Sequence, residues 1–439
     1  MKNSVFNRIS GIVLLIVSAG ILQGTVTAQE ESPDSPRIAA LAKEIKSGNA
    51  AALPSFWEEV KGKAPLVEPI AGDDKNLWVT FVWRGDSETK SMGVFGGAPF
   101  GGEQIKPLSR LGESDIWYRT ERLPKDSRFT YTLMLNPVKL VMGDKDLQAK
   151  AVKMSRRDPL NPRSFPTPPN AGYVELPDAP PQTWIKPQPD VPKGEIKSER
   201  FKSDILAEDR SIKIYTPPGY DPNGKPCALL IYFDGEIVPF IIPLGVILDN
   251  LIAKEKIPPT IAVMISSGAT RMRDLACSPK FADFLAKDLV PNLRSRFRIS
   301  ADPKHVAVSG VSLGGLMAAY SAMRHPEVIG NVLSQSGSYW YYEGLKENSP
   351  QSAFVESGWL AQQYSTLPKL PLKFYLEVGK LEQGFPINMV LENRRMRDTL
   401  VARGYPVTYS EYSGGHDMIC WRGSLADGLI ALLGKQEGK

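Results

Sequence analysis

The chain has 439 residues, 42% of them hydrophobic and 23% charged, which is typical of a globular protein with a substantial core. The formal net charge of +5 is mild, and no Lys/Arg run or basic stripe interleaved with aromatic residues favours nucleic-acid binding. The three cysteines and three histidines lack metal-ligand spacing, so we expect neither a disulfide scaffold nor a resident metal or cofactor.

Residues 1–28 have the pattern of a signal peptide. A basic start precedes an apolar run at 11–22, and small residues at Val26 and Ala28 mark a cleavage site. The run is shorter than the roughly 20 residues that span a bilayer. We therefore expect export to the periplasm or beyond, with no stable membrane insertion after cleavage. An uncleaved N-terminal anchor is the alternative.

The region after the leader divides into three parts. Residues 29–65 are polar and then weakly helical, whereas 66–165 hold short β-rich runs such as "LWVTFVW" and "RFTYTLML" between Gly, Pro and Asp turns. This alternation predicts a small β-sandwich. Residues 166–195 are expected to form a linker, because nine of the 37 prolines fall between 166 and 192.

Residues 196–437 repeat a pattern of strand, turn and helix. Nearly continuous apolar strands alternate with amphipathic helices, which favours a mostly parallel sheet with helices on both faces. Helices are expected at 281–296, at 387–403 and after Ser424. The expected strands are 211–216, 228–233, 260–265, 305–309, 372–378 and 407–412.

The sequence Gly310-Val311-Ser312-Leu313-Gly314 stands directly between an apolar strand and a helix. A G-x-S-x-G sequence in this setting is typical of a nucleophile elbow, a turn so sharp that its neighbours must be glycine. The following helix would direct its N-terminal dipole at the reaction centre. Ser312 is therefore the predicted nucleophile, and the alternative is a structural turn serine.

A serine hydroxyl needs a base to become a good nucleophile. His305 opens the strand that leads to the elbow and His325 closes the following helix, so both are expected to point away from Ser312. His416 follows the last strand in "YSGGHDMICWR", where a flexible loop can bring the imidazole over the serine. We predict His416 as the base, rather than a structural loop histidine.

The acid that orients the histidine is expected between the serine and the histidine in the chain. Glu382 lies in the loop after the strand "LKFYLEV" and is the predicted acid. Glu377 competes but lies within the strand, and Asp417 adjoins the histidine and is badly placed to accept from its ring. The predicted oxyanion hole uses backbone N–H groups of Leu313 and of Gly235 and Glu236 in "DGE".

Taken together, these residues resemble the enterochelin (enterobactin) esterase family, whose members are α/β-hydrolases of the esterase D type with their own N-terminal domain. In the second half the resemblance rests on "YFDGE", "LEVGKLE" and "GGHDMICWRG". In the first half it rests on "VTFVWRGD", "SDIWYRTERLPKDSRFTYTL" and "DPLNPRSF". Many esterases share the elbow, but few combine it with this β-rich front half.

The resemblance implies hydrolysis of the serine ester bonds in a cyclic tri-catecholate siderophore, which releases dihydroxybenzoyl-serine and makes the iron available. Iron would arrive only as part of the substrate. The family's catalytic roles carry over to Ser312, His416 and Glu382. An anionic aromatic substrate favours a pocket of arginines and flat rings, although each aromatic could equally pack in the core. The candidates are Arg271, Arg273, Tyr339, Trp340, Trp421 and Arg422.

Two features separate this chain from well-known family members. Those members work in the cytoplasm, whereas this chain carries an export signal, and its aromatic cluster extends to Tyr341 and Tyr342. The alternative function is therefore an exported carbohydrate esterase that removes feruloyl or acetyl groups from xylan. A silent binding protein is a third hypothesis, but it gives no reason to keep all three catalytic residue types in order.

Overall fold

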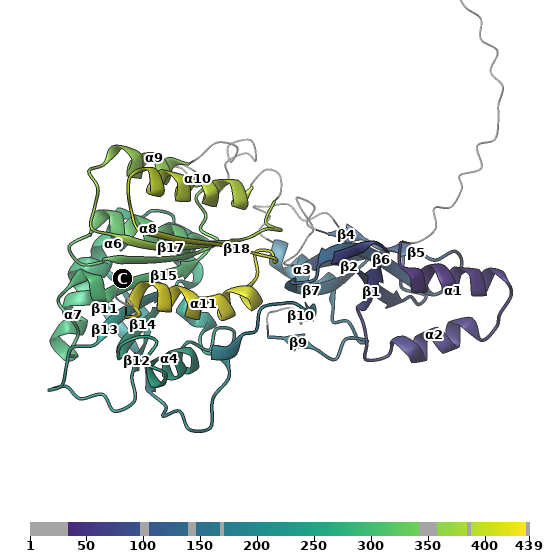
Figure 1. The fold of residues 1–439 in the computed structure, drawn as a ribbon, viewed down its shortest axis with the longest axis horizontal. Helices are drawn as coiled ribbons and strands as arrows, with labels where there is room; N and C mark the ends of the chain where they lie inside the picture. Colours follow the sequence, from purple (N-terminus) through teal and green to yellow (C-terminus); the bar gives the residue numbers. More distant parts are fainter. Residues whose placement is uncertain are drawn as a thin grey trace, which may run out of the picture.

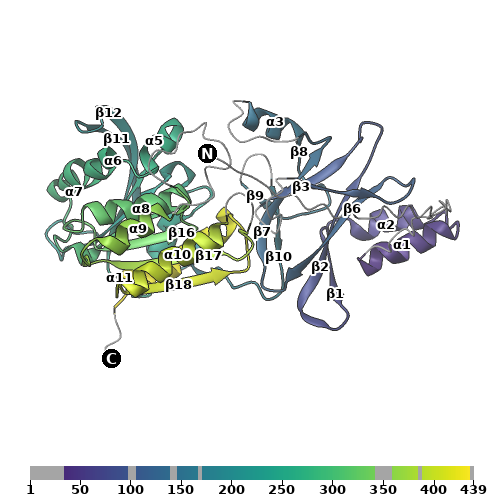
Figure 2. The ribbon, with the colours of Figure 1, turned by 90° about the horizontal axis from the view of Figure 1, so that it is seen from above.

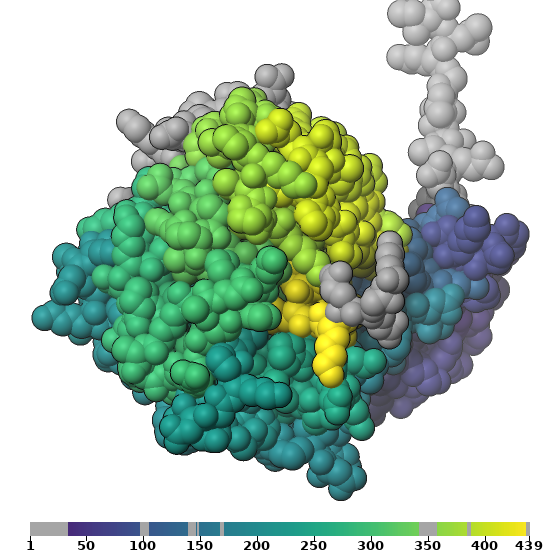
Figure 3. All heavy atoms as spheres, turned by 60° about the vertical axis from the view of Figure 1, so that its left-hand side comes forward, coloured from purple at the N-terminus to yellow at the C-terminus, as the bar shows by residue number. Residues whose placement is uncertain are grey.

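The computed structural model describes residues 34–96, 105–138, 146–166, 171–341, 358–383 and 388–435. Two units lie end to end along the long axis of the molecule, a β-rich front unit and a larger α/β unit (Figures 1 and 2). In the space-filling view the front unit, purple to blue, lies directly against the α/β unit (Figure 3). The predicted leader at 1–28 lies outside the described residues.

The front unit is built from two sheets and an N-terminal helix pair. Helices α1 (Pro36–Lys46) and α2 (Ala52–Val60) bury Ile38, Leu41 and Phe56 against one sheet. The other face of that sheet packs on the second sheet through a core that includes Phe81 and Phe129. The predicted sandwich is therefore present, with helices added before it. One sheet has the order β1 (Leu66–Ile70), β2 (Asp73–Arg84), β6 (Ile116–Pro124), β5 (Ser109–Arg110).

The second sheet of the front unit extends further along the chain than predicted. Strand β10 (Ala171–Glu175) pairs with β7 (Arg128–Leu135) and β9 (Ser164–Phe165), so part of the expected 166–195 linker belongs to the sandwich. The segment "AGYVE" can form a strand because it contains no proline, although prolines stand before and after it in the sequence. The remaining elements are β3 (Met92–Gly96), β4 (Lys106–Pro107), β8 (Ser155–Arg156) and α3 (Leu147–Met154).

The α/β unit has one eight-stranded sheet, in which the second strand from one edge pairs antiparallel with both of its neighbours and all other pairings are parallel. Every residue of β13 (Ala228–Phe233), β14 (Thr260–Ile265) and β15 (Val306–Val311) is buried, as expected for parallel strands covered on both faces. The order is β11 (Glu195–Ser203), β12 (Glu208–Thr216), β14 (Thr260–Ile265), β13 (Ala228–Phe233), β15 (Val306–Val311), β16 (Asn331–Gln335), β17 (Lys373–Gly379), β18 (Val407–Tyr412).

Helices cover both faces of this sheet and enclose two apolar cores. One face carries α8 (Leu313–Arg324), α9 (Trp359–Thr366), α10 (Met389–Ala402) and the long helix that was predicted at 281–296. That helix is continuous but contains a π-helical turn at Phe284–Leu289, between α6 (Pro279–Asp283) and α7 (Val290–Arg296). Pro291 explains the turn, because its ring removes a helical N–H. The opposite face carries α4 (Leu244–Ala253) and α11 (Met418–Leu433).

Short helical turns complete the unit: η1 (Thr183–Ile185), η2 (Gly235–Ile237), η3 (Gly268–Thr270), α5 (Arg271–Leu275) and η5 (Pro303–His305). No helix within the described ranges is both long and apolar enough to cross a membrane.

Candidate active site

Four parallel strands, β15 to β18, are neighbours in the sheet, so their carboxyl ends meet along one edge. A side chain of interest follows each of them. Ser312 comes directly after β15, Ser336 directly after β16, Glu382 shortly after β17, and His416 in the loop between β18 and α11. The topology thus brings together residues that are up to 104 positions apart in the chain.

Ser312 adopts a strained backbone conformation, with φ of 58° and ψ of −119°, and caps the N-terminus of α8. A β-carbon at Gly310 would lie 2.7 Å from the backbone of Gly314, so only glycine permits this turn. Strain of this kind persists where the surrounding structure enforces it. The predicted elbow is therefore present, and the N–H of Leu313, the first residue of α8, has no partner within the helix.

The Ser312 hydroxyl lies 3.2 Å from the hydroxyl of Ser338. Among the hydrogen bonds that the described residues form, none joins Ser312 to His416. Hydrogen bonds of this type are often long or open before a substrate binds. A rotation about the Cα–Cβ bond of Ser312 would turn the hydroxyl away from Ser338.

His416 is in close contact with Glu382, because Nδ1 of the ring lies 2.6 Å from Oε2 of the carboxylate. The imidazole also packs edge-on against Trp421, with ring centroids 4.7 Å apart. The side chain is 41% exposed, whereas that of Glu382 is 1% exposed. With Nδ1 held by a carboxylate, Nε2 is left for proton exchange with a hydroxyl.

The Glu382 carboxylate is itself fixed by donors on its second oxygen. The hydroxyl of Ser336 donates to Oε1 at 2.6 Å, and the backbone N–H of Gly379 donates to the same oxygen at 2.8 Å. The Ser336 hydroxyl accepts in turn from Nε1 of Trp421 at 3.1 Å. Sequence reasoning did not identify Ser336, although its place at the end of β16 beside the elbow strand would have been a usable signal.

Glu377, the competing acid, lies inside the sheet and does not reach the histidine. Its carboxylate accepts from Gln335, Ser424 and Tyr375 and is 1% exposed. Burial raises the pKa of Glu377 to about 7, and these hydrogen bonds oppose the rise. Asp417 caps α11 through Ile419 and also accepts from Thr130, so it too is turned away from the ring.

The raised pKa of Glu377 predicts a stability change with pH. The unfolded value is 4.5, so the stabilising contribution is complete below about pH 4.5 and is lost as the pH rises through 7. A shift of this size corresponds to about 3 kcal/mol. Glu377→Gln should therefore increase the free energy of unfolding at pH 8 and leave it little changed at pH 4.5.

Urea unfolding at both pH values would measure this difference. Comparing the two proteins at each pH removes the contribution of other buried acids, such as Asp427, whose pKa is also raised by burial. A variant that is less stable than the parent at pH 8 would contradict the assignment.

The loop after β13 has the form of an oxyanion-hole loop. Asp234 takes a left-handed conformation with φ of 55°, and a β-carbon on Gly235 would lie 2.7 Å from the Met264 carbonyl carbon. The ammonium of Lys213 donates to the carbonyl of Gly235 at 2.8 Å and also to that of Val238. Because C=O and N–H point in opposite directions across a trans peptide, Lys213 fixes the direction of the Glu236 N–H.

The predicted cationic residues are already paired within the protein. Nε and Nη2 of Arg271 each donate to one oxygen of Asp234 at 2.9 Å, so this arginine supports the loop after β13. Arg273 pairs with Asp274 and Glu208. Arg422 donates to Gln182 and stacks on Phe165 at 4.9 Å. The role of these arginines in substrate binding stays a prediction, and each of them already has a partner within the protein.

Two of the predicted aromatic residues are buried. Tyr339 is 0% exposed and donates to Ser334, and Trp421 is 2% exposed and packs on His416. Trp340 packs partly buried against the core, and Tyr342 lies outside the described residues. Tyr339 and Trp421 therefore cannot provide the flat substrate surface expected from the sequence, because the side chains that follow β16 and open α11 turn inward.

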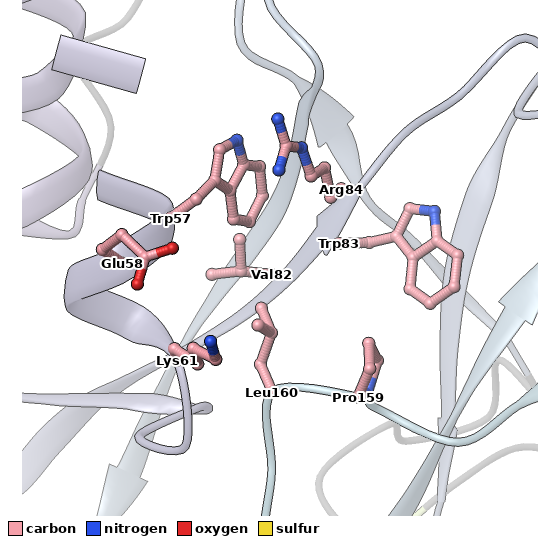
Figure 4. A pocket seen from close by; sticks show the side chains of 8 residues that line it. All are labelled: Trp57, Glu58, Lys61, Val82, Trp83, Arg84, Pro159 and Leu160. Carbon is pink, nitrogen blue, oxygen red and sulfur yellow. The ribbon is translucent and has the colours of Figure 1, made fainter. Parts of the chain in front are cut away.

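Exposed apolar side chains occur instead in the segments that follow β13 and β14. Phe240, in the loop that follows Gly235 and Glu236, is 78% exposed, and Met272, next to Arg271, is 41% exposed. A separate cavity of about 330 Å³ lies in the front unit between α2 and β2 and is lined by Trp57, Trp83 and Leu160 (Figure 4). It is far from Ser312, because α2 and α8 occupy opposite ends of the molecule (Figures 1 and 2).

Comparisons with known proteins match both units. Residues 203–432 match the family described as putative esterase, and residues 78–185 match the N-terminal domain of enterochelin esterase. The iron(III) enterobactin esterase of Dickeya dadantii is 30% identical over 413 residues, covering 86% of this chain and 92% of that protein. A crystal structure of the Shigella flexneri enterobactin esterase in the presence of enterobactin covers 86% of this chain and 97% of its own, with 27% identity and a TM-score of 0.69.

A relative with another activity matches over a shorter span. The endo-1,4-beta-xylanase/feruloyl esterase of Xylanibacter ruminicola is 30% identical over 188 residues, which is 40% of this chain and 26% of that protein. Similarity to the enterobactin esterases therefore includes the front unit and the α/β unit together.

Proposed function

The chain belongs to the enterochelin esterase family, and we propose on that premise that it hydrolyses the ester bonds of a tri-catecholate siderophore such as ferric enterobactin. The products would be dihydroxybenzoyl-serine units and iron that is easier to release. The observation that carries this proposal is the similarity over both units, front domain included. The iron belongs to the substrate and takes no part in the bond cleavage described below.

The first step of the proposed mechanism forms an acyl-enzyme. His416 accepts the proton of the Ser312 hydroxyl at Nε2 while Oγ attacks the ester carbonyl carbon, and Glu382 stabilises the imidazolium through Nδ1. The backbone N–H groups of Leu313 and Glu236 hold the oxygen that becomes negative. His416 then returns the proton to the departing serine hydroxyl of the substrate as the ester C–O bond breaks.

In the second step the same catalytic groups hydrolyse the acyl-enzyme and release the carboxylic acid product. His416 takes a proton from a water molecule, which attacks the acyl-enzyme carbonyl, and then donates that proton to Oγ of Ser312 as the acyl group leaves. One water is consumed for each ester bond cleaved. No redox partner is needed, because neither carbon nor iron changes its oxidation state.

Two exposed apolar side chains support an aromatic substrate. Phe240, after β13, and Met272, on α5 after β14, follow parallel strands whose carboxyl ends lie at the same edge of the sheet as that of β15, and flat catechol rings gain from burial against such side chains. This surface replaces the buried Tyr339 and Trp421 as the proposed binding platform for the acyl group.

We also propose that the protein acts outside the cytoplasm, after cleavage of residues 1–28. The basic start, apolar run and small residues at the cleavage position support export. An exported esterase of this family would open the siderophore in the periplasm or in the medium. The mass of the mature N-terminus in a periplasmic fraction tests this proposal.

A parallel assay tests the substrate. Purified residues 29–439 should cleave ferric and iron-free enterobactin to dihydroxybenzoyl-serine, as followed by chromatography, and should act weakly on methyl ferulate and acetylated xylan. Preference for ferulate or xylan would keep the esterase chemistry but assign the protein to polysaccharide breakdown. Among the comparisons, that alternative is supported by the match to a feruloyl esterase, which covers a shorter span of the chain.

A further inference from the structure

The first residues of β7 in the front unit lie along the loop that carries His416. The backbone N–H of Arg128 donates to the carbonyl of Ser413 at 3.3 Å, and the Arg128 carbonyl accepts from the thiol of Cys420 at 3.2 Å. A β-carbon on Gly414 would lie 3.1 Å from the Arg128 carbonyl oxygen, so glycine allows the close approach. These contacts hold the loop on both sides of the histidine.

Asp417, the residue next to His416, links the two units through two hydrogen bonds. Its Oδ2 accepts from the backbone N–H of Thr130 at 2.5 Å and from the Thr130 hydroxyl at 2.8 Å. Its Oδ1 accepts from the N–H of Ile419 at 3.1 Å and so caps α11. The residue is 4% exposed, and a buried carboxylate of this kind is tolerated only when donors satisfy it. Burial raises the pKa of Asp417 above its ordinary value, although the hydrogen bonds from Thr130 oppose the rise.

We propose that Thr130 and Asp417 are positioning residues for His416, so that the front domain completes the catalytic site of the α/β unit. The proposal rests on the role given to His416 under the proposed function. The side chain of His416 is tied to Glu382 on one side, and its backbone is tied to β7 through Asp417 on the other. With both ends held, the ring has one orientation relative to Ser312.

The geometry of the site explains why the link between Asp417 and Thr130 should affect the reaction rate. Glu382 alone fixes Nδ1 but leaves the ring able to pivot about that contact, because the imidazole is 41% exposed and packs on one other ring. A displacement of about 1 Å at a reacting group costs up to about 100-fold in rate. Releasing Asp417 from β7 should therefore slow the proton transfers and leave substrate affinity unchanged.

Thr130→Val removes the hydroxyl donor and keeps the side-chain shape. We expect kcat to fall between about 10- and 100-fold with KM unchanged, and we expect Thr130→Ser to restore it. Labelling of Ser312 by a small fluorophosphonate should slow by the same factor, since this reaction needs the serine and its base but no siderophore contacts. Thr80→Val is the matched control, because Thr80 is also buried in the front domain and its hydroxyl bonds Thr120 at 3.0 Å.

The outcomes separate the inference from the proposed function. If the parent protein labels with fluorophosphonate but cleaves no siderophore, the substrate assignment fails and the labelling rates still test the positioning role. If Thr130→Val labels at the parental rate, or if Thr80→Val slows equally at the same melting temperature, the positioning role is wrong. If Thr130→Val does not fold, Asp417→Asn replaces it. This change keeps the size of the side chain but places an amide, instead of a carboxylate, next to the Thr130 N–H. Labelling of Asp417→Asn at the parental rate would also overturn the inference.

Discussion

Replacing Ser312 with alanine should abolish ester hydrolysis, with a loss in kcat on the order of 10⁵- to 10⁶-fold. The elbow presents this hydroxyl at the end of β15 beside the unpartnered N–H of Leu313, and alanine leaves no atom to form the acyl-enzyme. Substrate binding should persist, because the truncation removes one oxygen and opens no cavity in the core. A strained turn with φ of 58° accepts alanine at much the same cost as serine.

Product release followed by chromatography measures the loss, and equilibrium binding of ferric enterobactin to the inactive variant measures what remains. Ser295→Ala is a suitable control, since Ser295 is exposed on α7 and bonds only its own helix. Residual activity of Ser312→Ala above a few per cent would exclude the nucleophile assignment, whichever ester is used.

The strands that the sequence predicts best are those with a clear local pattern, either continuously apolar or alternating. The strands at 228–233, 260–265 and 407–412 match β13, β14 and β18 residue for residue, since each is a short run bounded by turns. Strand β11 was missed because it lies at the sheet edge and reads "EIKSERFKS", mostly charged and exposed. Strand β16 was missed because "NVLSQ" buries three polar residues that only its neighbours can satisfy.

The candidate site also has parts that the sequence predicts and parts that it does not. Ser312, Glu382 and His416 were predicted from the G-x-S-x-G turn, from the order of the residues and from loops that follow strands, and the structure places them after neighbouring parallel strands. The binding candidates were chosen for nearness in sequence, which says nothing of side-chain direction, and Tyr339 and Trp421 turn inward. The bond between Thr130 and Asp417 joins residues 287 positions apart in two domains, and no local pattern encodes it.

Glu382→Gln is expected to lower kcat by about 10⁴-fold, the loss seen when the acid of such a triad becomes an amide. The Oε2 atom that now lies 2.6 Å from Nδ1 of His416 would become either an NH₂ group, which repels the ring N–H, or a neutral oxygen, which cannot offset the imidazolium charge. Ser336 and Gly379 both donate to Oε1 and so favour the oxygen of the amide at that position, leaving the NH₂ group toward the ring. The histidine would then be held in the wrong tautomer.

Glu377→Gln is the matched control, because the same substitution is made at a buried glutamate on the same strand-and-loop segment. Glu377 is held away from the His416 ring by hydrogen bonds from Gln335, Ser424 and Tyr375. Loss of the Glu377 carboxylate should therefore leave kcat within about twofold of the parent, while it changes the stability at high pH. Steady-state kinetics of both variants at one pH decide between the carboxylates. A larger kinetic loss at position 377 than at 382 would mean that the acid acts from within the sheet, and the contact between Glu382 and His416 would then have only a structural role.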